Sequence, residues 1–169
     1  LRLVGADTEV PLVQGGARRY VNFDYAASAP ALQSVHDAIE ELLGWYSSVH
    51  RGAGFKSRAS TAAYEGARES IRSFVNARAD DAVIITRNTT DSINLLAGTL
   101  PAGTHIVAFA GEHHANLLPW RRCAGVRYLP VPDSPAEMLG QLEETLRALP
   151  HCEDPHLVAV TGASNVTGE

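Results

Sequence analysis

The stretch HIVAFAGEHHAN, residues 105–116, joins a short apolar run to a polar cluster and decides the fold class of this 169-residue chain. Four apolar residues follow His105, which is typical of a buried strand ending near Phe109. Glu112, His113 and His114 follow after Ala110 and Gly111. A buried strand with polar residues at its carboxyl end predicts a parallel sheet with a ligand site beyond that end.

Three similar runs alternate with helical patterns along the second half of the chain. We expect further strands over residues 82–86, 126–130 and 157–161, and helices over 90–96, 115–123 and 135–149. Strands that alternate with helices are the signature of repeated βαβ units. The sequence therefore predicts an α/β fold, a three-layer αβα arrangement with a mainly parallel sheet.

The first half of the chain carries helical patterns. Residues 1–20 are expected to form a loosely structured lead-in, and residues 21–169 one partial domain. Apolar residues spaced by three and four predict an amphipathic helix over 31–46. Its buried face would hold Leu32, Val35, Ile39, Leu42 and Leu43. A polar, glycine-containing loop is expected over 47–60, and a second helix over 61–77.

Composition excludes several classes of function. The net charge of −5 and the pI near 5.8 give no basic field for nucleic acid. No apolar run has the roughly 20 residues that a membrane helix needs. Cys123 and Cys152, without C-x-x-C spacing, suit a reducing compartment. We therefore expect a cytoplasmic protein with no nucleic-acid or membrane partner.

Three of the predicted strand ends carry polar residues that could bind a ligand. Thr89 and Thr90 begin a helix after the run 82–86, so their amides and the Thr90 hydroxyl could hold a phosphate. The alternative is an ordinary N-cap by Asn88 or Thr89. Asn165 follows the run 157–161 and offers a donor and an acceptor, or is simply a turn residue.

The histidine pair stands at the end of the run 105–109. Adjacent side chains on an extended segment point opposite ways, so His113 could lie flat on an aromatic ring while His114 faces elsewhere. That geometry argues against a shared metal, and we expect none. A surface or capping role for both histidines is the alternative. A zinc site at His151, Cys152 and His156 lacks a second ligand pair, and the glycines at 52 and 54 lack the setting of a dinucleotide fingerprint.

Five motifs occur in a characteristic order: NFDYAASAP (22–30), VHRG (49–52), RNTTDSIN (87–94), EHHAN (112–116) and SNVTG (164–168). Together they resemble the class V aminotransferase family, which are fold type I pyridoxal phosphate enzymes. Within that family they are most similar to the cysteine desulfurase and selenocysteine lyase branch. The resemblance covers residues 21–169 and implies the N-terminal part of the family's large domain.

The resemblance implies roles for six residues. Thr90, with the Thr89 amide, would hold the cofactor phosphate, and His113 would stack on the pyridine ring and assist proton transfer. Asn165 would contact the ring oxygen or the substrate carboxylate, and Ala27 and His50 would line the substrate side. His114 is expected to be structural.

The resemblance also implies an enzyme acting on a small amino acid, as a homodimer in its complete form. Carbon–sulfur or carbon–selenium cleavage is the leading reaction. Amino transfer, another lyase or epimerase reaction, and a non-catalytic truncated homologue are the alternatives. The Schiff-base lysine of the family is expected beyond Glu169, because Lys56, the one lysine of the sequence, matches no family position. We therefore expect the segment alone to be inactive.

Overall fold

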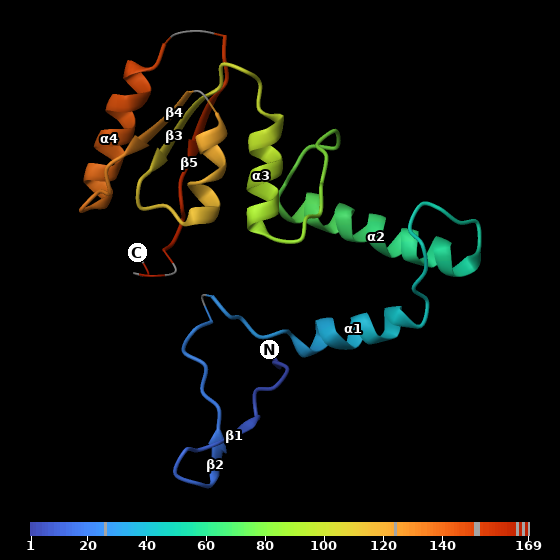
Figure 1. The fold of residues 1–169 in the computed structure, drawn as a ribbon. Helices are drawn as coiled ribbons and strands as arrows, with labels where there is room; N and C mark the ends of the chain where they lie inside the picture. The colour runs from blue at the N-terminus through green and yellow to red at the C-terminus, as the bar shows by residue number, and fades with distance from the viewer. Residues whose placement is uncertain (26, 124, 151–152, 165, 167, 169) are drawn as a thin grey trace. The chain divides into compact units, whose positions relative to one another are not determined.

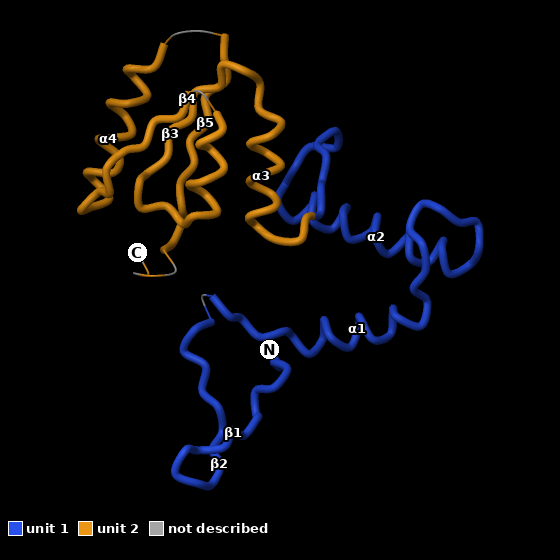
Figure 2. Tube along the Cα trace, in the orientation of Figure 1, with its two compact units in different colours: residues 1–85 blue, residues 86–169 orange. Residues whose placement is uncertain are grey.

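A computed structural model of the chain describes residues 1–25, 27–123, 125–150, 153–164, 166 and 168. The chain divides into two compact units (Figure 2). The N-terminal unit comprises Leu1–Ile85 and the C-terminal unit Thr86–Glu169. The boundary falls within the segment 21–169, for which the sequence predicts one domain.

A three-stranded parallel sheet forms the centre of the C-terminal unit (Figure 1). Its strands are β3 (His105–Phe109), β4 (Gly125–Leu129) and β5 (His156–Ala159), in the order β4-β3-β5. β3 is the central strand and pairs in parallel with both neighbours. The predicted strands over 105–109, 126–130 and 157–161 are confirmed, the last two with shifted ends.

Helices cover both faces of this sheet. One face packs Ile106 and Ala108 with Trp120 and with residues of α3 (Thr89–Thr99). The other face packs Val107, Phe109 and their neighbours against α4 (Pro135–Ala148). Alternate residues of β3 thus face opposite layers, as the period of a strand requires. The predicted αβα layering is confirmed.

Two predictions for this half of the chain are wrong. Residues 82–86 form no strand, because a strand needs a ladder partner and the described strands offer none to this segment. In place of a helix over 115–123 the chain forms two short 3₁₀ helices, η1 (His114–Asn116) and η2 (Pro119–Arg122). Proline at 119 has no N–H to continue a helix from η1, so the turn restarts there.

The first residues of the N-terminal unit are more ordered than predicted. β1 (Glu9–Pro11) and β2 (Ala17–Arg19) pair antiparallel as a hairpin. Gly15 and Gly16 adopt φ of 90° and 80° in its turn, a region that glycine enters without steric cost. The predicted lead-in over 1–20 therefore contains a hairpin.

The first predicted helix of this unit is α1 (Gln33–Leu43), which is shorter than the expected range 31–46. The prediction of its buried face is wrong, since α1 contains no buried residue. Val35 and Ile39, for example, are 49% and 53% exposed. The periodic pattern identifies the apolar side of a helix, but burial also requires a packed partner, which the described residues do not supply.

The second helix, α2 (Phe55–Phe74), begins at Phe55 instead of the predicted residue 61. The loop predicted over 47–60 is therefore wrong from residue 55 onward, and Ser57 and Ser60 are buried on α2. Their hydroxyl groups bond the backbone of residues 45–48. These polar residues of α2 thus hold the loop that precedes the helix.

None of the helices in the described part of the chain is long and apolar enough to cross a membrane.

Candidate active site at the carboxyl ends of the sheet

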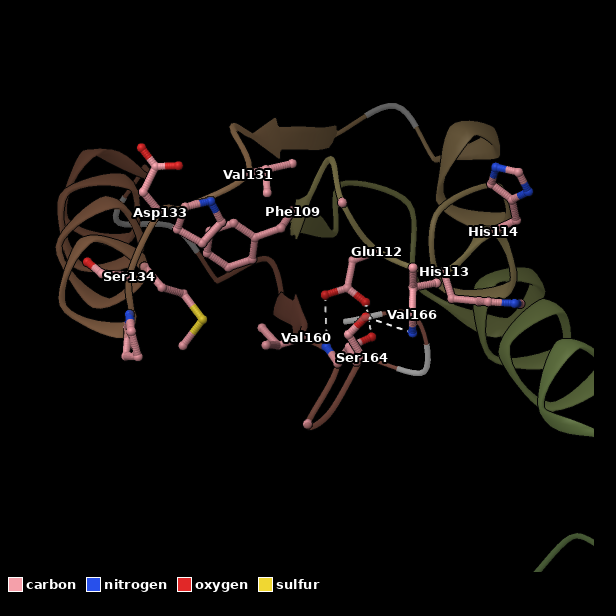
Figure 3. Close-up of a pocket in the computed structure, with 16 residues that line it drawn as sticks. Phe109, Glu112, His113, His114, Val131, Asp133, Ser134, Val160, Ser164 and Val166 are labelled. Carbon is pink, nitrogen blue, oxygen red and sulfur yellow. Dashed lines mark hydrogen bonds between the residues drawn. The ribbon is translucent and has the colours of Figure 1, made fainter. Parts of the chain in front are cut away.

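A cavity of about 920 Å³ lies beyond the carboxyl ends of β3, β4 and β5 (Figure 3). Residues 111–114 line it from the loop after β3, and residues 131–135 from the loop after β4. Residues 160–162, with Ser164, line it from the loop after β5. Ligands bind at this edge of parallel sheets because loops from several strands converge there. The sequence predicts a site at this edge, and the cavity lies there.

His113 lies on the wall formed by the loop after β3. Its Nδ1 accepts a hydrogen bond of 3.1 Å from the backbone amide of Ala115, so the proton of the neutral ring belongs on Nε2. The centroids of the His113 and His114 rings are 6.4 Å apart and their planes are tilted by 49°. The two imidazoles therefore do not stack on each other, and the flat faces of His113 are not covered by its neighbour.

Thr89 and Thr90 form the first turn of α3. Asn88 is the N-cap, and its Oδ1 accepts from the amide of Asp91 at 2.9 Å. The amides of Thr89 and Thr90 have no acceptor among the described residues. The N-cap and the anion site were alternatives in the sequence, but the cap uses only a later amide and leaves these two donors available.

An ion pair flanks this helix start. The Arg87 guanidinium donates two hydrogen bonds to the Asp91 carboxylate, at 2.7 and 3.0 Å. These bonds hold the pKa of Asp91 below its usual value and raise the pKa of Arg87. The charge of Arg87 is thus matched by Asp91, so the anion-binding capacity of this turn rests on its free amides and hydroxyls.

The cavity wall and the helix start belong to neighbouring elements. α3 contacts both η1 and η2, the short helices that follow His113. Thr89 and Thr90 do not line the cavity themselves. Their predicted role in holding a phosphate, like the stacking role of His113, stays a prediction.

Two further predicted site residues lie in the N-terminal unit. Ala27 donates its amide to the carbonyl of Asp24 in a tight turn. His50 has a left-handed φ of 59°, and its Nε2 lies 2.8 Å from a carboxylate oxygen of Glu65. The expectation that both line the substrate side stays a prediction. Asn165 lies outside the described residues, as do His151 and Cys152 of the zinc alternative.

Sequence reasoning missed the role of Glu112, which is 8% exposed and bonded to Thr161 and Asn116. Its position between a buried strand and His113 was the available signal. Cys123 is half-buried against the core around Trp120. Lys56 is exposed on α2. Among the described residues, no three His, Cys, Asp or Glu side chains are grouped to hold a metal ion.

Comparison with known proteins identifies the family. The model of the family described as aminotransferase class-V matches residues 21–169. The chain belongs to the class V aminotransferase family. Its αβα architecture is that of a fold type I domain, as the sequence motifs predict.

Several similar proteins are named cysteine desulfurase. The chain is 35% identical over 159 residues to a "Probable cysteine desulfurase" of Halalkalibacterium halodurans, covering 88% of this chain and 38% of that protein. It is 36% identical over 156 residues to a "Cysteine desulfurase" of Pectobacterium atrosepticum, covering 86% and 37%. A "Cysteine desulfurase" of Yersinia pestis is 34% identical over 171 aligned positions, covering 98% and 42%. The chain thus spans about two fifths of the length of these relatives.

Class V aminotransferases and cysteine desulfurases use pyridoxal phosphate, a flat ring with a dianionic tail. The described residues fit such a group in two respects. The unpaired amides of Thr89 and Thr90 are donors suited to a phosphate, and His113 presents an imidazole at a cavity that the sheet edge forms. Lys56, exposed on α2 in the N-terminal unit, is not among the residues that line this cavity.

Proposed function

We propose that this chain forms part of the pyridoxal phosphate pocket of an enzyme that acts on a small amino acid. The leading reaction is cleavage of a carbon–sulfur or carbon–selenium bond. One observation carries the proposal: in a chain of the class V family, the loops after β3 and β5 meet at one cavity, with His113 on its wall. The similarity to proteins named cysteine desulfurase supports the choice of reaction.

The chain's own residues would perform distinct tasks. Thr89 and Thr90 would bind the phosphate with backbone amides and the Thr90 hydroxyl. When bound, pyridoxal phosphate supplies an electron sink for bonds at the α-carbon of the amino acid. His113 would lie against the ring and hold a proton at Nε2, because the amide of Ala115 occupies Nδ1. Asn165 would orient the ring oxygen or the substrate carboxylate.

On the substrate side, Ala27 would leave space for a small amino acid and His50 would supply a polar contact. The contact of His50 Nε2 with the accepting Glu65 carboxylate would orient the imidazole. Further parts of the proposal are a homodimer, supported by the family resemblance, and a cytoplasmic location, supported by the composition and the cysteine spacing.

Amino transfer is the second candidate function, since the matching family model carries that description. Bond cleavage at sulfur and amino transfer share the phosphate and ring contacts named above. They differ in the amino acid consumed and in the product released. The complete protein is supplied with cysteine and a thiol reductant, or with a panel of amino acids plus an oxo acid. Release of sulfide with alanine marks bond cleavage, and conversion of the oxo acid to its amino acid marks amino transfer.

Binding of the cofactor tests the proposal on this chain directly. We expect the chain to retain pyridoxal phosphate in equilibrium dialysis, to bind pyridoxal without phosphate more weakly, and to release both when unfolded. His113→Ala should weaken retention, whereas the control His156→Ala, at the amino end of β5, should not. Equal retention of both compounds, or a borohydride-stable adduct at Lys56, would contradict the proposal.

A further inference from the structure

Glu112 is a buried carboxylate in the turn after the central strand. Glu112 is 8% exposed, and its backbone amide donates to the carbonyl of Phe109 at 3.2 Å. Taking a carboxylate out of water is costly unless hydrogen bonds replace the lost solvation. A residue of this type in this position therefore has to be held by specific donors.

Three donors hold it. The backbone amide of Thr161 donates to Oε1 at 2.8 Å, and the Thr161 hydroxyl donates a short hydrogen bond to Oε2. The side-chain amide of Asn116 also donates to Oε2, at 2.9 Å. An ionised carboxylate is an acceptor only, and all three partners are donors, so the set is chemically matched. Figure 3 shows Glu112 directed at the loop that carries Ser164.

The hydrogen bonds between Glu112 and Thr161 lie just beyond the paired parts of β3 and β5. The last paired residues of β3 and β5 are Ala108 and Ala159. Beyond them the two strands lead into loops that both line the cavity, and the Glu112–Thr161 contacts join these loops again. The carboxylate therefore fixes the separation of the two loops at a point that main-chain pairing does not reach.

The same carboxylate also holds η1, the short helix that follows His113. Asn116, which donates to Glu112, receives a hydrogen bond on its backbone carbonyl from the indole of Trp120, a core residue that is 1% exposed. The backbone amide of Asn116 donates to the backbone carbonyl of His113 at 2.7 Å. His113 is thus held between Glu112 on one side and an anchored η1 on the other, and it is among the residues that line the cavity.

We propose that Glu112 is a positioning residue that sets the distance between the His113 wall and the Thr161–Ser164 wall, and thereby the orientation of the His113 imidazole for a cofactor ring. The inference rests on the proposed function and adds a residue to it. Glu112 need not touch the cofactor or the substrate. It acts through Thr161 and Asn116.

The test uses substitutions that keep shape and remove single hydrogen bonds. In Glu112→Gln, the amide group can still accept from the Thr161 amide but opposes the Asn116 donor. Thr161→Val removes the hydroxyl at constant volume, and Thr161→Ser restores it. Glu143→Gln is the control, because Glu143 is exposed on α4 and bonds Arg147, one turn along the same helix. Each variant is made in the full chain.

Two readouts are needed. Without cofactor, the ring resonances of His113 and the amide resonance of Thr161 should move in Glu112→Gln and Thr161→Val, and return toward wild type in Thr161→Ser. With cofactor, we expect affinity for pyridoxal phosphate to fall about tenfold in the first two variants, as the loss of one charged hydrogen bond allows. Glu143→Gln should change neither.

The outcomes separate the inference from the proposed function. If wild type binds no cofactor but the His113 resonances still respond, the proposed function fails and the coupling of Glu112 to His113 stands. If wild type binds and the variants leave both the His113 resonances and the affinity unchanged, Glu112 does not position this site. A loss of folding stability with unmoved His113 resonances in Thr161→Val, the variant of constant volume, would also overturn the inference.

Discussion

Nε2 of His50 lies 2.8 Å from Oε1 of Glu65, and this contact holds a residue whose backbone is left-handed, with φ of 59°. The middle of α2 supplies two more contacts. The hydroxyl of Thr61 accepts from the His50 amide at 3.0 Å, and the ring of Tyr64 meets the imidazole edge-on at 5.8 Å. Three residues of one helix thus fix a backbone conformation that non-glycine residues seldom adopt.

This conformation predicts an unusual order of stability for substitutions at position 50. His50→Gly should be more stable than His50→Ala by about 1 kcal/mol, because alanine alone meets the steric cost of positive φ. Both variants lose the Glu65 contact equally, so their difference isolates the backbone term. Urea denaturation measures it. An alanine variant as stable as the glycine variant would show that position 50 is not left-handed.

The buried hydroxyl of Ser60 predicts a second stability effect. Ser60→Ala should lower the free energy of unfolding by about 1–3 kcal/mol, because the amide of Ser47, which donates to Ser60 Oγ at 2.8 Å, loses its acceptor. Hydrogen exchange at the Ser47 amide should accelerate in parallel. Ser73→Ala, at an exposed position of the same helix, is the control and should cost less than about 0.5 kcal/mol. Equal effects of the two changes would contradict the contact.

Two glycines of the C-terminal unit predict opposite responses to alanine. A Cβ at Gly125 would lie 2.6 Å from the carbonyl oxygen of Thr104, so Gly125→Ala should destabilise the sheet by about 1–3 kcal/mol. Gly140 lies on α4 with open space around a built Cβ. Gly140→Ala should therefore stabilise by about 0.5–1 kcal/mol through helix propensity. Thermal unfolding of both variants checks the pair, and a neutral Gly125→Ala would count against the pairing of β3 with β4.

The ion pair at the start of α3 predicts a pH dependence. The hydrogen bonds from Arg87 lower the folded-state pKa of Asp91 below its usual 3.8. This contribution to stability is therefore present above pH 3.8 and is lost as the pH falls through the folded-state pKa.

NMR titration of the Asp91 carboxyl measures this effect. In Arg87→Gln its midpoint should rise toward 3.8, while the midpoint of Asp81, which Arg78 lowers, should stay unchanged. An Asp91 midpoint that ignores the loss of Arg87 would refute the assignment of the cause.

The sequence predicts well those elements that are packed within their own compact unit, such as β3 and α4. β3 carries alternate residues into two apolar layers, so its run of apolar residues identifies a strand covered on both sides. α4 was equally readable, since Ser134 and Pro135 mark its start and its apolar face packs on the sheet.

Predictions failed where a segment's structure depends on a partner. Residues 82–86 have the composition of a strand but no ladder partner among the described strands, and α1 contains no buried residue. Ser57 and Ser60 were assigned to a loop because their role, bonding a distant backbone, leaves no periodic trace. Glu112 belongs to a motif that the sequence identifies, but its partner Thr161 lies 49 residues away, so the contact between them could not be predicted.

The central claim is that one ring lies against His113 with its phosphate at the start of α3. Nuclear Overhauser contacts between bound pyridoxal phosphate and the chain test it most directly. We predict contacts from the methyl group or ring proton of the cofactor to the His113 imidazole, together with shifts of the Thr89 and Thr90 amides. Contacts confined to other residues, such as Lys56, with unmoved Thr89 and Thr90 amides, would contradict the account.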